Sequence, residues 1–145
     1  MRKSRLLFYY LPPVLWAAVI FVASSLSNIQ VLEVGFSFED KVKHGLVYAI
    51  LGALIARALA HQEKFALNRR LLWGMSLLLG VLYGISDEFH QRFVPGRSPE
   101  VADALADALG VWLGTWLYLA GARCQNFFLR LKLKMLARKG ANFRP

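Results

Sequence analysis

The feature that most constrains this chain is an uncharged, mostly apolar run at residues 6–26. About 20 apolar residues in an α-helix are enough to cross the hydrocarbon core of a bilayer. A basic leader precedes the run, as in a cleaved signal peptide, but the run is longer than the ~7–15 apolar residues of a signal core. We therefore interpret residues 6–26 as a transmembrane helix.

Three further segments have the length and composition of membrane helices. With the first, the predicted helices cover about residues 6–26, 40–59, 71–91 and 101–120. Apolar residues make up 57% of the chain, whereas soluble domains have about 45–50% even with glycine counted. We predict an all-α integral membrane bundle of four transmembrane helices, residues 1–122, followed by a basic tail, residues 123–145.

Lysine and arginine are distributed unevenly among the segments between these helices. Fourteen of the 18 lie in the amino-terminal leader, in residues 57–70 and in the tail. Because cytoplasmic segments of membrane proteins are enriched in these residues, we expect both termini in the cytoplasm and the protein in the plasma (inner) membrane. We also expect the tail to lie as an amphipathic helix on anionic lipids of the inner leaflet. This distribution explains the net charge of +9 without nucleic acid as a partner.

The acidic residues are distributed the opposite way. Only Glu63, one of nine, lies on the predicted cytoplasmic side. The start of the second helix, the end of the third and the start of the fourth should therefore meet near the outer leaflet. Helical spacing gives each of them a polar face. These faces consist of His44 and Tyr48, of Tyr83, Asp87 and His90, and of Asp103 and Asp107.

Lipid cannot solvate these polar faces, so they should face one another or a wet cavity. Two glycine pairs, Gly80-x-x-x-Gly84 and Gly110-x-x-x-Gly114, would allow the helices to approach closely. Asp107 lies deepest and should need a partner there. The candidates for this partner are Lys41, His44 and Arg97.

The ordered combination of these residues resembles the VanZ-like family of membrane proteins. The motifs that carry the resemblance are Asp40-Lys41-x-x-His44-x-x-x-Tyr48, then Tyr83-Gly84-x-x-Asp87-Glu88-x-His90-Gln91-x-Phe93-x-Pro95-Gly96-Arg97, then Asp103-x-x-x-Asp107-x-x-Gly110. The resemblance covers about residues 15–119, including the Ser-Ser pair after the first helix, and leaves out the tail. The family is named for a protein that confers low-level resistance to teicoplanin, a glycopeptide that acts on cell-wall precursors outside the membrane. The resemblance implies a four-helix membrane protein with a role in the cell envelope.

Our first functional hypothesis is an enzyme that acts on a phosphorylated or lipid-linked headgroup at the outer leaflet. Lys41 and Arg97 would hold the anion, Arg97 by bidentate contact. A histidine oriented by a carboxylate would transfer a proton. The candidates for proton transfer are His44, His90, Asp87, Asp103 and Asp107. The candidates for substrate binding are Lys41, Tyr48, Tyr83, Glu88, Gln91 and Arg97.

Other interpretations use the same residues. The cluster could bind and shield an envelope headgroup without chemistry, or it could fasten helix ends together. An ion-coupled transporter would need more spans and polar residues in the cytoplasmic halves of the helices. We expect no cofactor; the alternative is a divalent metal on the histidines and carboxylates, for which Lys41 and Arg97 would compete. The single cysteine, Cys124, excludes a multi-cysteine metal site.

Overall fold

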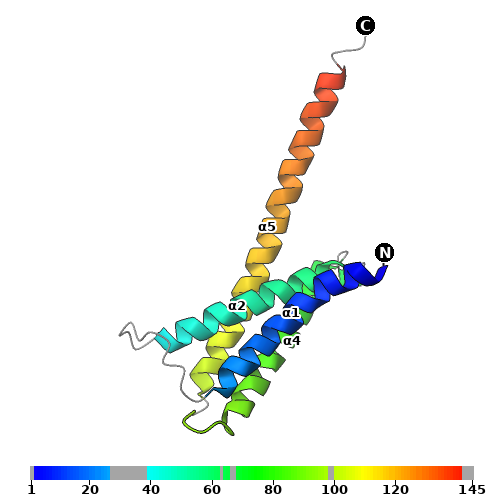
Figure 1. Cartoon of the computed structure of the whole chain (residues 1–145). Helices are drawn as coiled ribbons and strands as arrows, with labels where there is room; N and C mark the ends of the chain where they lie inside the picture. The colour runs from blue at the N-terminus through cyan, green and yellow to red at the C-terminus, as the bar shows by residue number, and fades with distance from the viewer. Residues whose placement is uncertain (1, 27–38, 63, 66–67, 98–99, 142–145) are drawn as a thin grey trace.

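The computed structural model describes residues 2–26, 39–62, 64–65, 68–97 and 100–141. Within them the chain forms four long α-helices and no strand, as Figure 1 shows. The helices are α1 (Arg2–Ser25), α2 (Glu39–Ala60), α4 (Arg69–Gln91) and α5 (Val101–Ala141). The predicted all-α bundle is confirmed.

Three of these helices, within the described part of the chain, are long and apolar enough to cross a membrane. The candidate spans are Leu7–Ser25, Lys41–Ala60 and Val101–Gln125. The uncharged stretch of α4 is shorter, residues 71–86, because charged residues lie at both of its ends. A helix needs about 17–25 apolar residues to span a bilayer. A fourth span in α4 therefore remains a prediction.

The carboxyl-terminal helix is longer than the sequence pattern suggested. We expected a helix ending near residue 120 and a separate tail, but α5 continues without a break to Ala141. Its last part, orange to red in Figure 1, extends away from the other three helices. The basic tail is thus a continuation of α5.

Helices α2 and α5 pack closely because glycines line their contact. A Cβ atom built on Gly110 would overlap the carbonyl group of Gly45, and one built on Gly114 would overlap that of Ala49. Only glycine lets two helix backbones approach this closely. The predicted role of the Gly110-x-x-x-Gly114 pair is confirmed, and this contact brings the starts of α2 and α5 together.

Helix α1 lies against α2 and α4 and is fastened to both by hydrogen bonds. The Trp16 indole nitrogen donates to the Val47 carbonyl oxygen at 3.0 Å. The Tyr83 hydroxyl donates to the Ala17 carbonyl oxygen at 2.5 Å. Much of the rest of α1 is exposed and apolar, as expected of a helix that faces lipid. These bonds fix the middle of α1. The end of α1 lies beside the end of α4, where Ser24 bonds Asp87 and Ser25 bonds His90, and we call this the polar end of the bundle.

Candidate functional site

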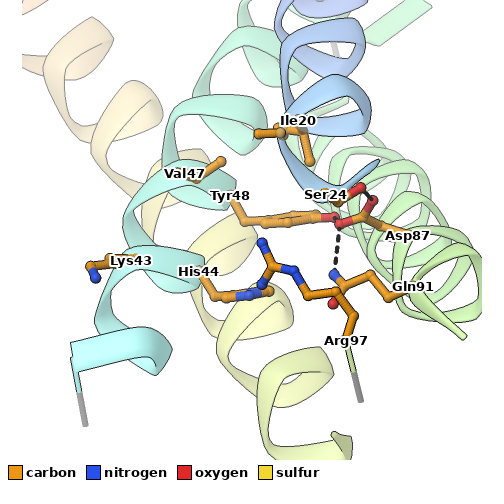
Figure 2. A pocket seen from close by; sticks show the side chains of 10 residues that line it. Ile20, Ser24, Lys43, His44, Val47, Tyr48, Asp87, Gln91 and Arg97 are labelled. Atoms are coloured by element: carbon orange, nitrogen blue, oxygen red, sulfur yellow. Dashed lines mark hydrogen bonds between the residues drawn. The ribbon is translucent and has the colours of Figure 1, made fainter. Parts of the chain in front are cut away.

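A cavity of about 210 Å³ lies at this polar end, between α1, α2, α4 and the loop that follows α4. Figure 2 shows side chains from all four segments around it. Its lining consists of Ile20, Ala23, Ser24, Lys43, His44, Val47, Tyr48, Asp87, Gln91 and Arg97. Five of these were predicted site residues: His44, Tyr48, Asp87, Gln91 and Arg97.

The Asp87 carboxylate is held by donors from three helices. It accepts hydrogen bonds from the Ser24 hydroxyl at 2.6 Å, the Tyr48 hydroxyl at 3.3 Å and the Gln91 amide at 3.4 Å (Figure 2). Its side chain is buried. A buried carboxylate is stable only when such donors replace its lost hydration. Asp87 therefore joins α1, α2 and α4 at the cavity.

The half-buried His44 and the buried Asp107 form a second pair, between α2 and α5. The His44 Nδ1 atom lies 3.0 Å from Asp107 Oδ1. With Nδ1–H donating to this carboxylate, the neutral ring carries its lone pair on Nε2, the form that accepts a proton. A Cβ atom on Gly84 would lie 3.2 Å from that of Asp107, so a glycine there leaves room for the aspartate. Of the three partners proposed for Asp107, the structure selects His44.

Arg97 enters the cavity from the loop after α4. Figure 2 shows its guanidinium group pointing toward Tyr48 and His44. The preceding residue, Gly96, has a φ of 80°, a left-handed conformation that favours glycine. Among the described residues, no ion pair involves the Arg97 guanidinium. The turn therefore delivers an arginine whose charge is not neutralised by a carboxylate of the described chain.

Lys41 lies outside the cavity lining and pairs with two carboxylates at the start of α5. Its ammonium nitrogen is 2.6 Å from Glu100 Oε2 and 2.9 Å from Asp103 Oδ1. The hydrogen bond and the charge of Lys41 lower the pKa of the Glu100 carboxyl group below its usual value. This cluster joins the start of α2 to the start of α5.

Glu88 completes the connection between α4 and α5. Its carboxylate accepts a hydrogen bond from the Glu100 backbone nitrogen at 3.2 Å and from the Gln91 amide at 3.4 Å. Ligand atoms of His44, Glu88 and Asp103 lie within 4.8 Å of one another, so these three could hold a cation. Lys41 already places a positive charge 2.9 Å from Asp103. A metal ion would have to compete with that lysine.

The two histidines predicted to converge have different neighbours. His90 Nε2 lies 2.9 Å from the Ser25 hydroxyl oxygen, and its ring packs on Phe21 with centroids 4.6 Å apart. His90 is absent from the cavity lining. Tyr83 is also absent, since its hydroxyl is bound to α1. Both residues therefore lie outside this cavity lining, although the Tyr83 ring packs beside that of Tyr48, with centroids 6.2 Å apart.

The candidate list from the sequence omitted two serines that the structure places among these residues. Ser24 and Ser25 bond Asp87 and His90, respectively. In the sequence they mark the membrane exit of the first helix. Two adjacent hydroxyl groups at the end of an apolar helix could have been predicted to bond the polar side chains of the other helices.

The sequence model of the VanZ/LLP1 family matches residues 6–123 of the chain. The match includes most of α1, all of α2 and α4, the first part of α5 and every residue that lines the cavity. No curated protein and no solved structure matches the chain.

Proposed function

Since the chain belongs to the VanZ/LLP1 family, we propose that this membrane protein binds the phosphorylated headgroup of an envelope lipid in its polar cavity. We propose further that the His44–Asp107 pair transfers a proton to or from the bound headgroup. The proposed reaction class is therefore acid–base chemistry on a phosphorylated or lipid-linked substrate. The family resemblance to a teicoplanin-resistance protein supports a role in the cell envelope.

The observation that supports anion binding most directly is the position and charge of the Arg97 side chain. Its guanidinium group points into the cavity and has no ion pair within the described chain. Asp87, the carboxylate in the cavity lining, already accepts hydrogen bonds from three donors. A guanidinium group binds two phosphate oxygens at once. Lys43 also belongs to the cavity lining.

The proposal of proton transfer depends on His44. Asp107, 3.0 Å from Nδ1, orients the imidazole ring and leaves Nε2 as its basic nitrogen. Asp107 is 1% exposed, so little water competes for this hydrogen bond. Histidine changes its charge near neutral pH, which suits a general base or acid.

We propose that the cavity opens at the outer leaflet of the plasma membrane. The support is the excess of lysine and arginine in the segments that precede α1, connect α2 to α4 and follow the last span. Both termini would then be cytoplasmic. The cavity, at the opposite ends of these helices, would face the leaflet that carries exported envelope precursors.

A second candidate function is binding without chemistry, in which the protein shields a headgroup from other molecules. The observation that favours it is that His44 also fastens α2 to α5 through Asp107. A purely structural histidine would make the same contact. Anion binding by Arg97 would then be sufficient for the function.

Lipid mass spectrometry of purified protein and of membranes tests the proposal and separates the two candidates. Arg97→Gln should remove a copurifying phosphorylated lipid, whereas Arg92→Gln should not, since Arg92 is exposed and absent from the cavity lining. His44→Gln should keep the bound lipid and stop its turnover in membranes. Retention of the same lipid by Arg97→Gln would contradict the proposed site. An unchanged membrane composition in His44→Gln would favour the binding candidate.

A further inference from the structure

A second cavity, of about 270 Å³, lies farther along the same three helices. It is lined by Tyr10, Pro13, Val14, Ala17, Leu51, Ile55, Ala58, Leu59, Leu79 and Tyr83. Tyr83 was a predicted substrate-binding residue; the other nine were not among the candidates. Val14 is 63% exposed and Leu79 is 43% exposed, so the cavity reaches the surface of the bundle.

The lining of this second cavity presents no polar group to an occupant. The two tyrosines contribute their rings, because their hydroxyls are bound elsewhere. The Tyr83 hydroxyl donates to the Ala17 carbonyl oxygen, and the Tyr10 hydroxyl accepts from the Gln62 amide at 2.6 Å. A molecule in this cavity can therefore be held only by apolar contact.

The two cavities follow one another on the same helix faces. On α4, residues four apart line first the polar cavity, at Gln91 and Asp87, and then the apolar one, at Tyr83 and Leu79. Four residues of α-helix advance about 6 Å along the axis. The polar and apolar linings are thus only one helical turn apart on α4.

The other two helices repeat this order. On α2 the polar cavity ends at Tyr48, and the apolar cavity begins at Leu51. On α1 the change occurs between Ile20 and Ala17. On all three helices the lining of the first cavity thus gives way to that of the apolar cavity within about one turn. A molecule with a polar head and an apolar chain requires such an arrangement.

From this adjacency we propose that the apolar cavity holds one hydrocarbon chain of the lipid whose phosphorylated headgroup occupies the polar cavity. The inference rests on the function proposed above and names its substrate class. The substrate is an amphiphile, one hydrocarbon chain of which lies between α1, α2 and α4. Protein interiors are otherwise close-packed, so an open apolar space of this size suits a chain from the surrounding lipid.

Photolabelling of the full chain in liposomes tests this inference. The probe is hexadecyl phosphate with a diazirine group in the middle of its chain, and labelled positions are read by peptide mass spectrometry. Label is expected on residues of the apolar cavity. Val14→Trp fills the mouth of the cavity, and Val19→Trp is the matched control, because Val19 is 54% exposed on the same helix but lines neither cavity.

We expect Val14→Trp to reduce labelling about tenfold, since exclusion of even two methylene groups costs that much in affinity. Val19→Trp should label like the wild type, and Arg97→Gln should also reduce labelling. If Arg97→Gln reduces labelling but Val14→Trp does not, and the label lies on outer helix faces, the chain site is wrong and the headgroup site stands. If Val14→Trp reduces labelling and Arg97→Gln has no effect, the chain site stands and the headgroup proposal fails.

Discussion

The Asp87 carboxylate accepts hydrogen bonds from side chains of three helices. Its donors are Ser24, Tyr48 and Gln91. We expect Asp87→Ala to lower the free energy of unfolding by more than about 2 kcal/mol, because a buried donor without a partner costs ~1–3 kcal/mol. Thermal unfolding in detergent measures this change. Ser86→Ala is the control, since the exposed Ser86 bonds only within its own helix; equal unfolding midpoints for both variants would contradict the role of Asp87.

Glu100 should show an acid-shifted titration that depends on one lysine. Lys41 lowers the pKa of the Glu100 carboxyl group below its ordinary 4.5. A group whose pKa falls on folding stabilises the protein above its ordinary pKa and loses this effect as pH falls through the lowered value. The contact should therefore persist at neutral pH and weaken only below pH 4.5. Because Glu100 is exposed, its effect on stability should be small.

Side-chain carboxyl NMR measures this titration directly. In Lys41→Met the pKa of Glu100 should return toward its ordinary value. Lys43→Met, which removes a lysine two positions away, should leave the titration of Glu100 unchanged. A Glu100 titration that is the same in all three proteins would mean that Lys41 does not contact it in solution.

At the residue scale, helical spacing predicted which residues belong to the site better than it predicted which residues they contact. His44, Tyr48 and Asp87 follow from polar positions that recur on apolar helices. The neighbours of His90 do not follow, because spacing fixes a face of one helix but not which helix lies opposite. In the structure α1 takes that place and supplies Ser25. Arg97 was predicted as an anion-binding residue, but the direction of its side chain could not be predicted, since it depends on the conformation of the turn at Gly96.

At the scale of elements, the contact between α2 and α5 depends on glycines. We expect Gly114→Ala to destabilise the bundle by about 1–3 kcal/mol, the usual cost of overpacking, because the new methyl group would meet the Ala49 carbonyl. Gly121→Ala, later in α5, adds a methyl group with no atom within 4 Å. That control should be neutral or stabilising by ~0.5–1 kcal/mol, since alanine favours a helix. Unfolding in detergent compares the two, and a similar loss in both would refute the close contact.

The helices themselves were predictable because hydropathy marks long apolar segments, and the starts of α2, α4 and α5 lie within two residues of their expected positions. The end of α5 was not predictable by the same means. Hydropathy falls after residue 120, but charged residues are good helix formers, so the backbone continues to Ala141. Hydropathy shows where the chain leaves the membrane. It does not show where the helix ends, because that requires a capping or helix-breaking residue.

At the scale of the whole molecule, the proposed function depends on which side of the membrane the cavity faces. The single cysteine, Cys124, is exposed at the far end of the α5 span and can report this. With both termini in the cytoplasm, a membrane-impermeant maleimide should modify Cys124 only after cells are permeabilised. In a Cys124→Ser background, Arg92→Cys should react in intact cells and Arg70→Cys should not. Both arginines are exposed, one at each end of α4, so this pair also tests whether α4 crosses the membrane. Reaction of Cys124 in intact cells, with no reaction of Arg92→Cys, would show that the cavity faces the cytoplasm. Arg97 could then not bind an exported precursor.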